Sequence, residues 1–566
     1  MAIEANPAAA LTQFRAGFEI AERLVKLDPS NIEVQRSLSA AHGRIGSVLM
    51  MQGDVAGALN TQRAARAIDE RLASADPDNA RRQSGVSATD MQIGALLTML
   101  GDSKEALNSF RASQAILEGL AKDDPNNTSW ANDLAMSHWT IAVVQDNLGD
   151  QPAALVSARA AHAVWERLAM ADPNNADWQW CLGASDFLVG SLLMKQIKVP
   201  EALESYRTAA AVMHRLAERD PNNTMYRLAL SLVDINIGDL LKSQGDLPKA
   251  VESYRESLAI AEQLASVNAD VLAFEDNLAT AHDKVAEALV AQSKLPDALE
   301  SYRAALAVRD RLANAKPEHA ESQMKLAAAL NNVGDVLKEQ GKVAEALETY
   351  RAALAKVDPI ATASPDSTDR QFALVVPLAN ICMTTAQRGQ FAVGLNECER
   401  GLVVARTLTR LAPDSPGYKK ILVAFETALP DYRTETALAL IPVAWDALVA
   451  GEPAKALAAA ERSLSLAPGH LTAETNRVHA LMYLGRAQEA RALYLAHKDE
   501  LLPDNNNQPW QQAITEDFAE LRKAGRGHPQ MAEIETAFKV RAEARKQCSA
   551  QHLSSKRQDC RRRTGT

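Results

Sequence analysis

The histidines and cysteines are the residue types in this chain that could act together as a general base and a nucleophile. A His beside a Gly, as at His42-Gly43, is a candidate base for a Cys elsewhere in the chain. The same position of a repeating pattern is occupied by His42, His138 and His282. This recurrence predicts core positions rather than a catalytic site. Three further residues lie within stretches of helical periodicity, where we expect buried thiols: Cys181, Cys382 and Cys398.

No short motif supplies the rest of an active site. The sequence lacks the phosphate-binding loop GxxxxGK[ST], the zinc motif HExxH, the nucleophile motif GxSxG and the GxGxxG of nucleotide-binding folds. Its five Cys have no paired spacing, so we expect neither a disulfide framework nor a zinc site. The sequence therefore predicts a protein that is not an enzyme and holds no metal or cofactor.

The composition indicates helices that must position any binding residues. Of the 566 residues 47% are hydrophobic but only 5% are aromatic, and the apolar residues are mostly the helix formers Ala and Leu. The net charge is −10, and because residues 539–566 hold nine Lys and Arg against two Asp and Glu, the rest of the chain carries −10 − (9 − 2) = −17. An acidic body is poorly suited to nucleic acid, and no apolar stretch is long enough to cross a membrane. Without a signal sequence, we expect an all-α, cytoplasmic chain.

A repeat of 48 residues organises most of the chain. The dipeptide Asp-Pro recurs at this interval, beginning at Asp28, Asp76, Asp124, Asp172 and Asp220. A column of turn glycines keeps the same period, with Ile197 and Ser293 as exceptions: Gly53, Gly101, Gly149, Gly245, Gly341 and Gly389. In each unit an Asn after the Asp-Pro can cap a first helix, the Gly can end it, and a second helix follows. Stacked antiparallel helix pairs of this kind predict an α-solenoid.

The columns within each unit resemble the tetratricopeptide repeat, with a large residue, Gly, Leu, a turn Gly, Ala and an aromatic. One unit carries Ile237, Gly238, Leu241, Gly245, Ala250 and Tyr254, and another carries Val333, Gly334, Leu337, Gly341, Ala346 and Tyr350. The family's period is 34 residues, so the 48-residue unit implies helices about two turns longer, roughly 20 residues each. This lengthened form is similar to the arrays attached to bacterial signalling effectors.

The resemblance implies a concave groove, lined by the first helices, that binds a protein or peptide segment. The groove columns are apolar and Met-rich in the N-terminal half and acidic with scattered Lys in the C-terminal half. The candidate binding residues are Met50, Met91, Trp139, Phe187 and Met194, then Asp239, Glu287 and Asp335. Trp139 and Phe187 either anchor a binding hot spot or pack locally. The three acidic residues either steer a basic peptide or form an ordinary solvated face.

The period also divides the chain into five segments. Residues 1–27 form a helix without a preceding partner, and residues 28–411 form the tandem helix pairs. Residues 412–500 hold an irregular helix that is broken at Pro430 and a 34-residue unit. We expect residues 501–547 to form a helical cap that begins with a linker over 501–509, and residues 548–566 to form a basic disordered tail.

The helix expected over residues 1–27 has apolar residues that no upstream helix covers. These residues are Leu11, Phe14, Phe18 and Leu24. The chain is then a truncated form of a longer one, or it self-associates through this helix, or a partner helix caps it.

These patterns favour a non-catalytic scaffold that binds protein partners through its groove. The alternative is the sensing or autoinhibitory half of a bacterial signalling effector, caspase-like or nucleotide-hydrolysing, whose catalytic domain is missing or separate.

Overall fold

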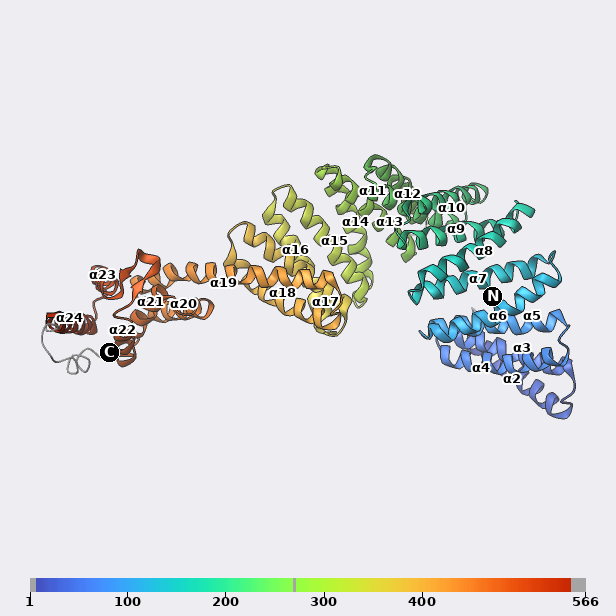
Figure 1. Cartoon of the computed structure of the whole chain (residues 1–566), viewed down its shortest axis with the longest axis horizontal. Coiled ribbons are helices and arrows are strands. Elements are labelled where there is room, and N and C mark those ends of the chain that lie inside the picture. Colours follow the sequence, from blue (N-terminus) through green and yellow to red (C-terminus); the bar gives the residue numbers. More distant parts are fainter. Residues whose placement is uncertain (1–6, 268–270, 551–566) are drawn as a thin grey trace. The chain divides into compact units, whose positions relative to one another are not determined.

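The computed structural model describes residues 7–267 and 271–550, which are almost entirely helical (Figure 1). The chain divides into two compact units, Met1–Val308 and Arg309–Thr566. In both units consecutive helices pack against one another along the chain. The predicted all-α solenoid of helix pairs is therefore confirmed.

The first unit alternates the first and second helices of successive repeats. The first helices are α3 (Ile32–Met51), α5 (Ala80–Met99), α7 (Thr128–Asn147), α9 (Ala176–Lys195), α11 (Thr224–Ser243) and α13 (Leu272–Ala291). The second helices are α2 (Pro7–Leu27), α4 (Val55–Ala75), α6 (Ser103–Asp123), α8 (Gln151–Ala171), α10 (Val199–Arg219), α12 (Leu247–Val267) and α14 (Leu295–Ala315), which contains the boundary between the units. Helices of 20 or 21 residues confirm the predicted lengthening, as in α11 and α12.

The predicted caps set the helix bounds. The Asn side chains after the Asp-Pro dipeptides accept hydrogen bonds from backbone N–H groups of the first turn, at Asn31, Asn79, Asn127, Asn175 and Asn223. The turn after each first helix is left-handed, as at Gly245 with φ +82°. Ile197 and Ser293 adopt the same turn, at φ 60° and 59°, although their Cβ atoms disfavour it. The packing of the repeat therefore holds the turn where glycine is missing.

Close approach of paired helices depends on a small residue opposite an aromatic ring. A Cβ on Gly238 would lie 2.4 Å from a ring carbon of Tyr254, and one on Gly334 would lie 2.5 Å from Tyr350. Both rings are fully buried. The ring thus fills the space that the glycine leaves, as the repeated columns require.

The second unit continues the helix pairs and then shortens them. Its helices are α15 (Ala320–Glu339), α16 (Val343–Thr362), α17 (Thr368–Gln387), α18 (Phe391–Leu411), α19 (Pro416–Ala450), α20 (Pro453–Leu466), α21 (Leu471–Tyr483), α22 (Ala487–Ala496), α23 (Trp510–Lys523) and α24 (Pro529–Ala550). The predicted break at Pro430 is wrong, because α19 runs through both Pro430 and Pro442 as one helix of 35 residues. An interior proline removes one backbone hydrogen bond. The packing of α18 and α20 along α19 compensates for that loss.

The predicted linker over 501–509 is also wrong. Strands β1 (Leu501–Leu502) and β2 (Gln508–Pro509) pair antiparallel around the short helix η1 (Pro503–Asn505). Trp510 follows directly, is fully buried, and donates from its indole N–H to the Tyr494 carbonyl at 3.2 Å. The polar stretch is therefore a hairpin, held by an aromatic anchor that starts α23.

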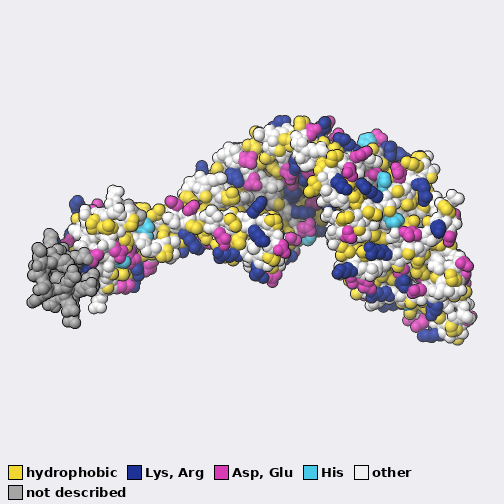
Figure 2. Space-filling view, viewed as in Figure 1, with side chains coloured by type: hydrophobic (Ala, Val, Ile, Leu, Met, Phe, Trp, Pro, Cys, Tyr) yellow, Lys and Arg dark blue, Asp and Glu magenta, His cyan; other side chains and the backbone are white. Residues whose placement is uncertain are grey.

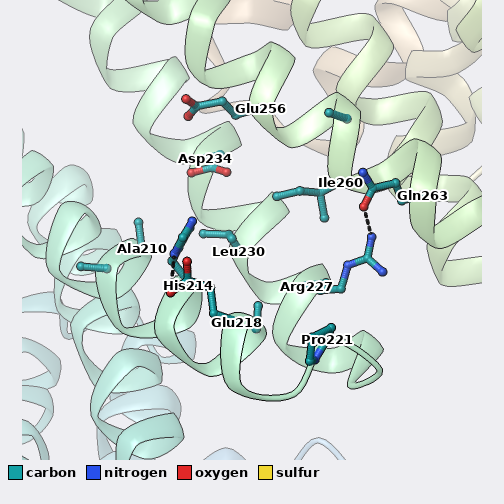
Figure 3. A pocket seen from close by; sticks show the side chains of 13 residues that line it. Ala210, His214, Glu218, Pro221, Arg227, Leu230, Asp234, Glu256, Ile260 and Gln263 are labelled. Atoms are coloured by element: carbon teal, nitrogen blue, oxygen red, sulfur yellow. Dashed lines mark hydrogen bonds and ion pairs between the residues drawn. The ribbon is translucent and has the colours of Figure 1, made fainter.

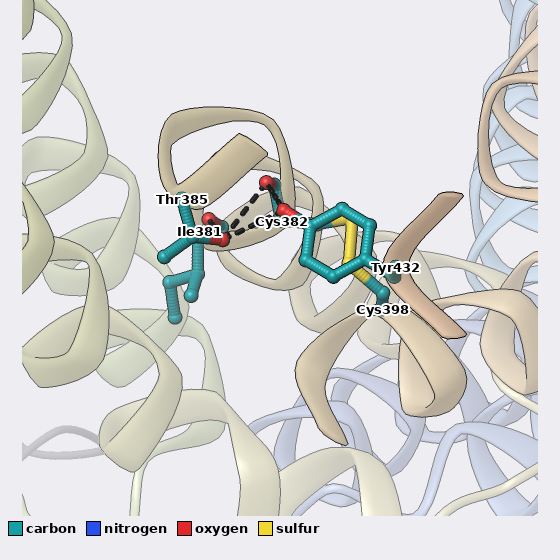
Figure 4. The surroundings of a disulfide bond; sticks show 5 residues. All are labelled: Ile381, Cys382, Thr385, Cys398 and Tyr432. Atoms are coloured by element: carbon teal, nitrogen blue, oxygen red, sulfur yellow. Dashed lines mark hydrogen bonds between the residues drawn. A yellow bond between two sulfur atoms is a disulfide. The ribbon is translucent and has the colours of Figure 1, made fainter. Parts of the chain in front are cut away.

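A disulfide joins Cys382 of α17 to Cys398 of α18, with 5.2 Å between the Cα atoms (Figure 4). The expectation of two buried thiols is wrong here because the paired helices place the two side chains opposite each other. Tyr432 of α19 lies beside the bond, and its hydroxyl is 2.7 Å from that of Thr385. Cys181 remains a half-buried free thiol.

The apolar residues of α2 are partly covered by the chain itself. Phe14 and Phe18 are half-buried, and Phe18 packs edge-on against His42 of α3 with ring centroids 4.8 Å apart. Ile20 and Leu24 remain exposed. The uncovered face is therefore smaller than the sequence predicted. Within residues 7–267 and 271–550, none of the helices is apolar over a length that would span a membrane.

Candidate functional site

Charged side chains join consecutive first helices within the first unit across one common face, here called the first-helix face. Lys195 of α9 contacts Asp146 of α7 at 2.6 Å. Lys242 of α11 contacts Glu287 of α13 at 2.6 Å, and Lys284 of α13 contacts Asp239 of α11 at 3.0 Å. Each of these pairs bridges two repeats. These pairs bring α7 next to α9, and α11 next to α13, on the side of the predicted groove columns.

The predicted acidic residues have partners of their own. Asp239 accepts a hydrogen bond of 2.7 Å from the Tyr254 hydroxyl as well as the ion pair with Lys284. Burial opposes the charge of Lys284, yet its bond to Asp239 and the charge of Glu287 raise its pKa. Because lysine lies beside Asp239 and Glu287 alike, the first unit has paired charges rather than a free acidic stripe.

Asp335 lies in the second unit, where it repeats part of this arrangement. It accepts a 2.6 Å hydrogen bond from Tyr350, and Lys338 lies 3.7 Å away. Burial, followed by the bond to Asp335, raises the pKa of the Tyr350 hydroxyl above its ordinary value. A tyrosine fifteen residues after a first-helix acceptor is thus part of the repeat itself. Figure 2 shows acidic and basic side chains interspersed over the visible surface rather than gathered by sign.

The apolar candidates are mostly half-buried. Trp139 packs at the edge of a core cluster with Trp165, and Met91 packs at the edge of another with Phe110. Phe187 packs on Tyr206 with ring centroids 5.5 Å apart. These side chains are held in place by the core while part of each remains accessible.

Two further candidates differ in exposure. Met194 packs against the same core cluster as Phe187. Met50 is exposed over 43% of its surface. The sequence reasoning noted scattered lysines in the C-terminal half of the groove but did not pair them with the acids. The 45-residue spacing from Asp239 to Lys284 and from Lys242 to Glu287 was a signal for that pairing.

Comparisons with known proteins agree with the repeat. Models of the family described as tetratricopeptide repeat match residues 235–268 and 286–359. None of the curated proteins matches the chain.

Several solved structures are similar at low identity. The apo form of the quorum sensor NprR from B. thuringiensis is 12% identical, with 71% of this chain and 99% of that chain covered and a TM-score of 0.40. A STAND-class signal transduction ATPase with a tetratricopeptide repeat sensor from Pyrococcus horikoshii is 12% identical, with 70% and 56% covered and a TM-score of 0.42. BtubC from P. vanneervenii is 16% identical, with 47% and 91% covered and a TM-score of 0.34.

Proposed function

We propose, from the premise that this chain is a tetratricopeptide-repeat protein, that it is a non-catalytic scaffold whose first-helix face binds a segment of a partner protein. The observation that carries the proposal is the set of ion pairs between α7 and α9 and between α11 and α13, which aligns side chains of successive repeats on one face. An extended surface of this kind suits a linear segment better than a small molecule.

The apolar candidates would supply most of the binding energy. Trp139, Phe187 and Met194 are already ordered by contacts with the core. Binding of a partner would therefore cost these side chains little conformational entropy. Aromatic side chains that are partly accessible and rigid are typical interface anchors. The paired charges of Asp239 and Glu287 would instead set the register of the partner.

The first test compares partner capture from native cells by the wild type and by a Trp139→Ala/Phe187→Ala variant. We expect the partner to be lost from the variant, because truncating a hot-spot residue costs about 2 kcal/mol or more, which is roughly thirtyfold in affinity. The matched control is Val156→Ala/Met170→Ala, which removes two exposed apolar side chains from the second helix α8. Circular dichroism and melting curves must match the wild type for both variants.

A photo-crosslinker tests the position of the contact directly. Benzoylphenylalanine in place of the exposed Met50 on α3 should capture the partner, whereas the same group in place of Val156 on α8 should not. Capture from position 156 alone, or partners that survive the loss of Trp139 and Phe187, would refute the proposed face.

The proposal places the scaffold in the cytoplasm, as its composition predicted. The disulfide between Cys382 and Cys398 is the feature that weighs against this location, because structural disulfides are rare in the reducing cytosol. Both sulfurs are buried, so the cells are quenched in acid and the unfolded protein is alkylated before mass spectrometry. Free, labelled thiols at both positions are expected for a cytoplasmic protein, and protection from labelling would exclude that location.

A further inference from the structure

A pocket of about 830 Å³ opens between the second helices α10 and α12, with the first helix α11 as its floor (Figure 3). Its walls are small and apolar, with Ala210 and Ala217 from α10 and Ala259 and Ile260 from α12. Leu230 and Asp234 form the floor. The size and apolar lining are those of a site for a small ligand or a single side chain.

The floor carboxyl is buried without a partner. Asp234 is only 7% exposed, and among the described residues no group forms a hydrogen bond or an ion pair with its carboxyl. Burial, followed by the negative charge of Glu256, raises its pKa to about 7. A buried carboxylate is costly unless a cation or a hydrogen-bond donor accompanies it.

The repeat of Asp90 supplies the missing partner itself. Asp90 and Asp186 occupy the positions equivalent to Asp234, 144 and 48 residues earlier. Arg66 lies 2.5 Å from Asp90. His162 lies 3.3 Å from Asp186, but burial lowers the pKa of this histidine, and one carboxyl oxygen of Asp186 has no hydrogen-bond partner among the described residues. In both cases the basic residue lies on the preceding second helix, 24 residues before the acid.

In the repeat of Asp234 that basic position is Ala210, which lines the pocket. The pocket therefore includes the space that a basic side chain would fill. The acid without a partner, Asp234, and the position without a base, Ala210, therefore line the same pocket.

The remaining charges around the pocket also favour a cation. Figure 3 places the Glu256 carboxyl beside Asp234 at one end of the pocket. At the other end Arg227 is held by the Gln263 amide. His214 lies 3.5 Å from Glu218 on the same helix. Among the residues that the structure describes, no cation pairs with the carboxyl group of Asp234 or of Glu256.

We propose that this pocket binds a guanidinium or ammonium group carried on an apolar stem, with Asp234 as its buried counter-ion and Glu256 at the rim. The alanine walls and Ile260 enclose the stem. A free organic cation and an Arg or Lys side chain of a partner protein share this chemistry. The site lies between second helices, so it is independent of the first-helix face.

The test is calorimetry on the full chain with butylguanidinium and with butylurea, which has nearly the same shape and no charge. We expect butylguanidinium to bind at least about tenfold more tightly than butylurea, because a charge-assisted hydrogen bond to a buried carboxylate is lost with the neutral compound. Asp234→Asn should weaken butylguanidinium binding by a similar factor. The control Glu252→Gln makes the same kind of change on α12 one turn before Glu256, outside the pocket, and should bind as the wild type does.

A second variant tests the register argument. Ala210→Arg places an internal cation opposite Asp234, as Arg66 stands opposite Asp90, and should abolish butylguanidinium binding in a folded protein. Its helicity, measured by circular dichroism, should remain that of the wild type.

The peptide acetyl-Ala-Arg-Ala-amide separates the two sources of the cation. Competition by the peptide indicates a partner side chain, and exclusion of the peptide with retention of butylguanidinium indicates a free organic cation. The proposal is overturned if the wild type binds no butylguanidinium at millimolar concentration, if butylurea binds equally well, or if Asp234→Asn leaves binding unchanged.

Discussion

The buried carboxyl of Asp234 should make the stability of its repeat depend on pH. Its pKa in the folded chain is about 7, against an ordinary value of 3.8, chiefly because burial disfavours the charged form. The folded state therefore holds a proton that the unfolded chain releases. The stability gained from that proton is fully present below about pH 3.8 and is lost as the pH rises to about 7.

The magnitude follows from 1.36 kcal/mol for each pKa unit. At pH 5 the wild type has lost about 1 to 2 kcal/mol relative to acid conditions, and at pH 8 it has lost at most about 4 kcal/mol. Asp234→Asn carries no titrating group and escapes this loss. The variant should therefore gain stability over the wild type by about 2 to 3 kcal/mol between pH 5 and pH 8.

Hydrogen exchange read by mass spectrometry is the suitable assay, because a repeat array opens locally rather than all at once. At a given pH, the ratio of exchange rates in wild type and variant reports the difference in opening free energy for peptides of α11 away from residue 234. The other groups at the pocket, His214, Glu218, Arg227 and Glu256, are common to both proteins and cancel to first order. A ratio that stays constant from pH 5 to pH 8 would falsify the reasoning, as would a variant less stable at pH 8.

Three further outcomes can be measured by urea unfolding or, where one region must be resolved, by hydrogen exchange. Gly238→Ala should destabilise the chain by about 1–3 kcal/mol, because the new methyl group meets the buried ring of Tyr254. In the control Gly85→Ala the methyl group meets open space beside α5, so the variant should be about 0.5–1 kcal/mol more stable than the wild type. Equal effects of the two substitutions would contradict the packing argument. Reducing the disulfide between α17 and α18 should lower stability by up to about 3 kcal/mol in the second unit and leave exchange in the first unit unchanged. Lys284→Ala should cost under about 1 kcal/mol, with a smaller effect in high salt, because its bond to Asp239 is partly exposed; a loss unaffected by salt would show a packing role instead.

The repeated columns made the helices predictable because caps, turns and core positions all recur at one interval. Asn223 and Gly245 bound α11 as predicted, and their partners lie within the same segment of chain. Local signals of this kind need no knowledge of distant residues.

Where the outcome depended on packing between helices, the sequence reasoning failed. Pro430 has the local signature of a helix end, yet neighbours on both sides keep α19 continuous. The two cysteines of the disulfide lie one helix apart, and their separation of 16 residues does not reveal that they face each other. The sequence analysis did not single out Asp234, because its relation to Ala210 matters only once the preceding second helix is placed against it.

The ion pairs between first helices also bear on how such an array can change its length. Deleting one whole unit of 48 residues would leave helices of the same lengths to stack in the same way. The side chains would no longer match, because the positions 48 residues before Asp239 and Lys242 are Ser191 and Met194. Lys284 and Glu287 would then face a serine and a methionine. The repeats are thus interchangeable as backbone units, but only their native order places oppositely charged side chains of neighbouring repeats against each other.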